Sequence, residues 1–243
     1  MKIVSTEGFV VSTTKYGENS KILNIITKDY GIIGVISRGC MSNKSILRTV
    51  SERFVYANFN INYKANKLST LINADVINYF QHIKSDINLV GYLTYLTELV
   101  DNVYKQNDSP EIYNIFVSTL LKIEQQLDPL VLTNILEVKF LDYLGIGLSL
   151  DGCAKCGNKN IVSISHKQGG FLCKNCYDNS GFTNKNALKT IRLYYYVDIN
   201  KISELNITND TKMEIDNFLN HYYKDYTGLY IKSKEFLNNL KRY

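Results

Sequence analysis

The sequence contains few of the residues and motifs from which active sites are usually built. Only three histidines occur, His82, His166 and His221, and they lie far apart along the chain. There is no Gly-x-Ser-x-Gly elbow, no His-Glu-x-x-His motif and no Walker A loop. Acidic neighbours such as Glu98 and Asp101 fall at helical spacing, where solvated carboxylates are the simpler interpretation. We therefore expect a protein that is not an enzyme.

Long apolar runs are also missing. No stretch approaches the roughly 18 apolar residues that cross a bilayer, and the N-terminus does not pair a basic start with a long apolar segment, as a signal peptide does. The hydrophobic content of 45% is nevertheless enough to bury a core. The length of 243 residues allows one large domain or two smaller ones. We expect a cytoplasmic protein without a membrane segment.

Excess positive charge is absent from most of the chain and concentrated at its start. Residues 1–80 hold ten lysines and arginines and five acids, whereas the other 163 residues hold 18 of each sign. The whole net charge of +5 therefore belongs to the first third. This asymmetry favours a polyanion-binding module there, and a solvated lysine-rich surface is the alternative.

The first 80 residues carry strand patterns. Within residues 21–38, two β-branched runs are separated by Asp29-Tyr30-Gly31, a hairpin signal in which Gly31 can take the positive φ of the turn. Apolar and polar residues alternate along 54–63, and further strands are expected at 8–13 and 68–74. Five short strands in about 75 residues fit a small closed barrel such as an OB-fold.

The middle and end of the chain carry helical patterns. Spacings of four and three residues join Leu89, Leu93, Leu96, Val100 and Val103 into one amphipathic stripe. Both prolines, Pro110 and Pro129, follow an N-cap residue at an expected helix start. The helix at 129–144 is apolar on most sides and should be buried. Further helices are expected at 186–196, 209–223 and 231–240, with the tyrosines at 194–196 packing between helices rather than stacking on bases.

Four of the five cysteines form two close pairs, Cys153 with Cys156 and Cys173 with Cys176, separated by 16 residues. In a reducing compartment such pairs indicate a metal site rather than disulfides. Two facing C-x2-C turns supply the tetrahedral four-sulfur shell that Zn²⁺ prefers. The intervening residues predict a β-hairpin that turns at 168–170. Because four sulfurs close the shell, we expect a structural zinc without a catalytic water.

Three other interpretations concern this region and the remaining cysteine. A thioredoxin-like redox motif is the alternative for either cysteine pair, but the required βαβ context is missing. His166 lies between the pairs and is expected to be a surface residue. Cys40 is expected to be a small buried residue.

The order of these motifs resembles bacterial RecO proteins. Residues 7–39, EGFVVSTTKYGENSKILNIITKDYGIIGVISRG, are similar to the family's opening strand, Tyr-Gly-Glu turn, hydrophobic hairpin and Arg-Gly segment. Residues 44–48, KSILR, resemble its Lys-Ser-x-Leu segment. Residues 140–157, FLDYLGIGLSLDGCAKCG, resemble the helix that leads into its cysteine pair, and 227–237, TGLYIKSKEFL, its closing helix. The resemblance covers essentially the whole chain.

This resemblance implies an α+β multidomain protein: an N-terminal OB-fold barrel at 1–80 and an α-helical domain at 81–243, with a four-cysteine zinc finger inserted at 150–180. It also implies a recombination mediator in DNA repair that is cytoplasmic and nucleoid-associated. Such a protein binds and anneals single- and double-stranded DNA. It works with RecR to load RecA onto DNA coated by single-stranded-DNA-binding protein. Family members often carry several arginines after the position of Arg38, where this chain has Cys40-Met41-Ser42-Asn43.

An OB-fold binds nucleic acid by following phosphates along a basic groove and stacking bases on aromatic rings. The stacking candidate is Tyr16, and Lys232 and Lys234 are a secondary possibility for phosphates. The main phosphate candidates are Lys15, Lys21, Arg38, Lys44, Arg48 and Arg53. Two alternatives stay open: an RNA-binding or ribosome-associated OB-fold/zinc-ribbon protein, and a structural adaptor whose basic face is incidental.

Overall fold

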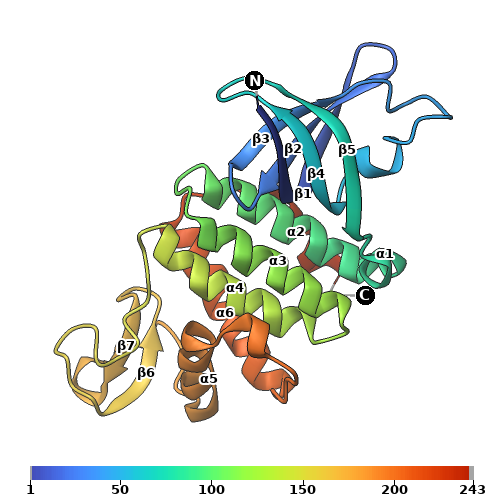
Figure 1. Cartoon of the computed structure of the whole chain (residues 1–243). Helices are drawn as coiled ribbons and strands as arrows, with labels where there is room; N and C mark the ends of the chain where they lie inside the picture. Colours follow the sequence, from blue (N-terminus) through green and yellow to red (C-terminus); the bar gives the residue numbers. More distant parts are fainter. Residues whose placement is uncertain (1, 241–243) are drawn as a thin grey trace. The chain divides into compact units, whose positions relative to one another are not determined.

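A computed structural model of the chain describes residues 2–240, and it is an α+β protein with a five-stranded β part followed by a helical part (Figure 1). The chain divides into two compact units, the first ending at Val117 and the second beginning at Ser118. Within residues 2–240, no helix combines the length and apolar character that crossing a membrane would require.

Most of the first unit is a closed barrel of five strands. The strands are β1 (Lys2–Tyr16), β2 (Ser20–Thr27), β3 (Gly31–Ser37), β4 (Tyr56–Tyr63) and β5 (Ser69–Asn78). β1 pairs antiparallel with β4 through its first half and with β2 through its second half. Antiparallel pairs join β2 to β3 and β4 to β5, and a short parallel β3–β5 pair closes the ring.

The expected strand pattern is confirmed, with corrections at several strand ends; β5, for example, extends to Asn78. Along β4 the apolar side chains fill the barrel, including Phe59 and Ile61, while Asn58 is exposed. Gly31 has the positive φ expected of the hairpin turn, +65°. β1 is longer than expected, since it begins at Lys2. Phe54 was expected in the fourth strand but has a φ of +66° and precedes it, because its N–H bonds to the carbonyl of Val10 at a kink.

Helices α1 (Gln81–Ser85), α2 (Ile87–Tyr104) and the first part of α3 (Pro110–Glu124) complete the first unit. The apolar stripe of α2 is buried as expected. Phe9 of β1 contacts Phe116 of α3 and Phe80 before α1, with ring centroids 5.1 and 5.9 Å apart. Aromatic packing therefore continues from the barrel into the helices of this unit.

Up to residue 240, where the described part ends, the second unit holds four further α-helices and a β-hairpin. They are α4 (Pro129–Tyr143), β6 (Ile161–Ser165), β7 (Gly170–Cys173), α5 (Lys185–Tyr196), α6 (Asn209–Tyr226) and α7 (Lys232–Leu240). α4 is central, as its apolar sequence predicted, and contacts both α5 and α6. Asp128 caps it: its Oδ1 accepts from the N–H groups of Leu130 at 2.9 Å and Val131 at 3.1 Å, with Pro129 at the first helical position. This start is the one expected from Asp-Pro.

A buried ionic cluster anchors α7. Glu137 of α4 is only 1% exposed, and its Oε1 lies 2.7 Å from Nζ of Lys234. The same ammonium lies 3.7 Å from Oδ1 of Asp216 on α6. Buried charges must be paired, because solvation is lost. The charge of Lys234 is therefore engaged in the core, and Lys234 is not carried forward as a candidate for DNA contact.

Candidate metal centre and nucleic-acid interface

The four paired cysteines converge on one point. Their Sγ atoms all lie within 4.8 Å of one another, and those of Cys156 and Cys173 are 3.6 Å apart. A tetrahedral shell with Zn–S bonds of about 2.3 Å places its sulfurs roughly 3.8 Å apart. In the part of the chain that the structure describes, no other group of three or more histidine, cysteine or acidic side chains converges in this way. The donor set fits a tetrahedral metal ion.

Backbone hydrogen bonds shape the first turn of the site and join it to the hairpin. The N–H of Gly157 donates to the carbonyl of Cys153 at 2.8 Å, and the N–H of Cys153 donates to Asn158 at 2.9 Å. Gly157 has a φ of +74°, which glycine adopts without strain. The N–H of Ala154 donates to Phe171 of β7 at 2.7 Å, which joins the first turn to the hairpin. The hairpin thereby brings the second pair beside the first.

The thiols titrate differently because of their surroundings. Desolvation raises the pKa of Cys153, but backbone N–H groups led by that of Cys173 outweigh it and lower the pKa to about 6. For Cys176, hydrogen bonding with Cys156, then burial and the remaining thiols, raise the pKa to about 12. Four thiolates repel one another, so full ionisation requires a bound cation.

The apolar cluster around the site is small. Its buried members are Cys153, Leu172 and Cys173, with Ile161 and Cys176 at its edge. Hydrophobic burial of this size contributes little to holding two turns and a hairpin together. A metal bond network would contribute much more, and a four-sulfur shell leaves no position for a reacting water.

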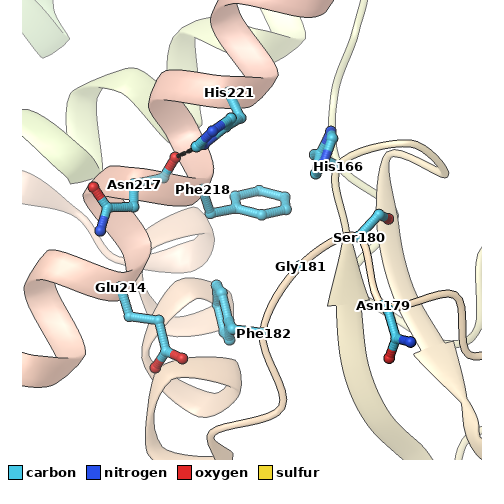
Figure 2. A pocket seen from close by; sticks show the side chains of 9 residues that line it. All are labelled: His166, Asn179, Ser180, Gly181, Phe182, Glu214, Asn217, Phe218 and His221. Atoms are coloured by element: carbon cyan, nitrogen blue, oxygen red, sulfur yellow. Dashed lines mark hydrogen bonds between the residues drawn. The ribbon is translucent and has the colours of Figure 1, made fainter.

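His166 is not the surface residue that the sequence suggested. Its side chain is only 20% exposed, and its Nδ1 lies 3.2 Å from Oδ2 of Asp225. Figure 2 shows it across a pocket of about 340 Å³ from His221 of α6, and their ring centroids are 5.9 Å apart. His221 Nδ1 is hydrogen-bonded to the carbonyl of Asn217 at 2.7 Å. Two histidines that are distant in sequence thus meet where the hairpin packs on α6.

Three of the phosphate candidates lie at one end of the barrel. In the β1–β2 pair Lys15 lies opposite Lys21, and in the β2–β3 pair Lys21 lies opposite Ser37, directly before Arg38. The segment after β3 folds back over this end, because the N–H of Met41 donates to Asn19 at 3.1 Å. Tyr16, the stacking candidate, is 51% exposed beside them.

The segment between β3 and β4 carries the other candidates on a series of turns. Leu47 and Val50 pack against the barrel core and fix the segment to it. Lys44 and Arg48 are exposed, and Arg48 Nη1 donates to Asn43 Oδ1 at 2.7 Å. Cys40 is buried, as expected. The segment is therefore an anchored platform for basic side chains.

Two candidates have their charged groups engaged within the protein. Lys21 is 19% exposed and its Nζ lies 2.7 Å from Glu52 Oε1. Arg53 Nε donates to the carbonyl of Val11 at 3.0 Å, and its guanidinium lies 4.2 Å from the centroid of the Phe54 ring. Burial of this guanidinium lowers the pKa of Arg53. Arg53 is exposed as a residue, but these contacts hold its guanidinium. Lys15, Arg38, Lys44 and Arg48 are also exposed. We name these last four the barrel-end cations.

Comparison with known proteins covers both units. Residues 1–80 match the family model "Recombination protein O N terminal", and residues 84–235 match "Recombination protein O C terminal". A DNA repair protein RecO of Bacillus pumilus is 33% identical over 98% of this chain and 95% of its own length. Those of Halalkalibacterium halodurans and Bacillus subtilis are 32% and 30% identical over 97% and 98% of this chain and 94% and 95% of their own lengths. The chain belongs to the RecO family.

Proposed function

We propose that this protein is a non-enzymatic, DNA-binding recombination mediator in DNA repair. The observation that carries the proposal is the basic end of the barrel, where Lys15, Arg38, Lys44 and Arg48 are exposed on an anchored surface. Relatives that match nearly the whole chain are named for DNA repair. Membership of the family and the charge of this surface support the same conclusion.

The proposed mechanism needs no covalent chemistry. The barrel acts as an OB-fold within a domain at 1–80, and the barrel-end cations neutralise phosphates while Tyr16 offers a ring for base stacking. Lys21 and Arg53 contribute to the surface by holding its segments together. Neutralising two backbones lowers the repulsion between complementary strands, which favours annealing. Phosphate contacts carry no sequence information, so we expect little sequence preference.

The second domain, 81–243, carries the zinc finger at 150–180. Cys153, Cys156, Cys173 and Cys176 would hold one structural Zn²⁺, and the metal would supply the stability that the small apolar cluster does not. Family membership supports RecR, RecA and single-stranded-DNA-binding protein as functional partners, and a cytoplasmic, nucleoid-associated location.

A strand-annealing assay tests this function. Complementary oligonucleotides are mixed with the purified full-length protein, with and without the cognate single-stranded-DNA-binding protein as a coat. We expect faster annealing in both conditions, and a lower rate for the Arg38→Gln/Arg48→Gln variant. No acceleration of annealing would refute the proposal. A clear preference for RNA in competition would favour the ribosome-associated alternative, because phosphate and base contacts of this kind do not require a 2′-hydroxyl.

A further inference from the structure

A second basic groove lies in the second compact unit, within the part of the chain after residue 80 in which positive and negative charges balance. It has a volume of about 600 Å³ and runs between α5 and the start of the β6–β7 hairpin. Lys185, Lys189 and Arg192 line it from α5, and Lys159 lines it from the hairpin side. Asp151 is its single acidic residue. The charge balance over residues 81–243 therefore hides a local concentration of cations.

The α5 side of the groove is a straight row. Lys185, Lys189, Arg192 and Tyr196 are spaced by four, three and four residues, so they share one helical face. At about 1.5 Å of rise per residue, the row is roughly 16 Å long. All four side chains are exposed, while Ile191 on the opposite face is buried. One face of α5 is thus packed in the unit, and the face that carries the row is exposed to solvent.

Asp151 organises one end of this row. Its Oδ1 lies 3.2 Å from Nη2 of Arg192 and accepts from the hydroxyl of Tyr196 at 2.8 Å. The guanidinium of Arg192 lies 5.8 Å from the centroid of the Tyr196 ring. Lys159 Nζ donates to the carbonyl of Asp151 at 2.8 Å. These exposed contacts fix the positions of Arg192, Tyr196 and Lys159, and the groove keeps its net positive charge.

The tyrosines at 194–196 differ in burial. Tyr194 is buried and packs in the helical core, as the sequence predicted. Tyr196 is 58% exposed and ends the row of cations. A basic groove that leads to an exposed aromatic ring combines the two elements by which proteins bind single strands, phosphate neutralisation and base stacking. An acidic peptide would also pair with the cations, but it has no bases to stack on the Tyr196 ring.

We infer that this groove, between α5 and the zinc-finger hairpin, is a second binding site for single-stranded nucleic acid. The inference rests on the proposed DNA-binding function and deepens it, because one chain would then hold two strands. Two strands held on one molecule meet at a much higher effective concentration than two free strands. Annealing would then gain both from charge neutralisation and from this proximity.

The experiment is a binding titration of the full-length zinc-loaded protein with fluorescent oligothymidylate of about ten nucleotides, a length within the roughly 4–16 that one OB-fold covers. We expect two strands per wild-type chain and one per chain of Lys185→Glu/Lys189→Glu. The matched control reverses Lys201 and Lys224, two exposed lysines outside the groove, and should still bind two. Zinc content and circular dichroism verify that each variant is folded.

Crosslinking gives a second readout. An oligonucleotide that contains 5-iodouracil should form ultraviolet adducts on α5 peptides as well as on barrel peptides, and Tyr196→Phe should keep the α5 adduct while Tyr196→Ala loses it. A wild-type stoichiometry of one, unchanged by Lys185→Glu/Lys189→Glu, would overturn the inference and leave the groove to an acidic protein partner. The inference would also be overturned if the Lys201/Lys224 control lost as much oligonucleotide binding as Lys185→Glu/Lys189→Glu. If wild type binds no oligonucleotide, the proposed DNA-binding function itself fails.

Discussion

The barrel-end cations allow a quantitative prediction of salt dependence. Each phosphate contact to single-stranded DNA contributes about 0.7 to the slope of log K against log salt. Among the six basic candidates, Lys21 and Arg53 are engaged with Glu52 and with Val11 and Phe54. Four contacts therefore remain, and they contribute a slope of about −2.8.

Two matched neutralisations test this count. Arg38→Gln/Arg48→Gln removes two exposed cations and should flatten the slope by about 1.4. Lys21→Gln/Arg53→Gln removes the same charge from the same end of the barrel but should change the slope by close to zero. This second pair should instead lower stability, because Arg53 loses its bond to Val11 and its packing on Phe54. The change in slope is the test, since contacts elsewhere contribute equally to all variants.

The assay is fluorescence anisotropy with a labelled single strand, repeated at several salt concentrations for each variant. Binding should weaken similarly for oligonucleotides of different sequence, because phosphates are read without regard to the bases. Equal slope changes for the two pairs would refute the distinction between the barrel-end cations and the cations engaged within the protein. An unchanged slope for Arg38→Gln/Arg48→Gln would place the first binding site away from this end of the barrel.

Three further predictions follow from the helical unit. Metal analysis should find about one zinc per chain. Cys153→Ser should lose the metal and destabilise this unit, because structural zinc in small peptides contributes on the order of 10–16 kcal/mol. A Cys153→Ser variant that retains its full metal content would contradict the four-sulfur site. Cadmium, which also binds thiolates, should replace zinc without loss of DNA binding, whereas loss of binding in folded cadmium protein would argue against a purely structural metal. Lys234→Met should cost about 3–5 kcal/mol of unfolding free energy in urea titrations, because it removes the ammonium that lies beside the buried Glu137 and Asp216. Replacing the exposed Lys224 by Met should change the unfolding free energy by no more than about 0.5 kcal/mol. Similar costs for both variants would refute the buried cluster.

Local signals in the sequence were enough to predict most elements and the four cysteines that converge. The Asp29-Tyr30-Gly31 turn, the Asp128-Pro129 helix start and the apolar α4 depend on interactions within a few residues or on burial of a whole segment. Each was found where expected. The two C-x2-C pairs could be interpreted in the same way, because each pair is a single turn. The end of β1 nearest the N-terminus and the kink at Phe54 were not predictable, since both depend on pairing with a distant strand.

The tertiary structure decided which charged residues are available. The sequence determined that residues 1–80 carry the excess positive charge. It did not distinguish Lys21, Arg53 and Lys234 from the other basic residues that were candidates for phosphate contact. Folding paired Lys21 with Glu52 and Lys234 with Glu137, residues 31 and 97 positions away. It also gathered Lys159 with Lys185, Lys189 and Arg192 into one groove, within the stretch 81–243 whose charges sum to zero. Composition sums charges along a chain, whereas binding depends on their distances in space, and those distances exist only after the segments have packed.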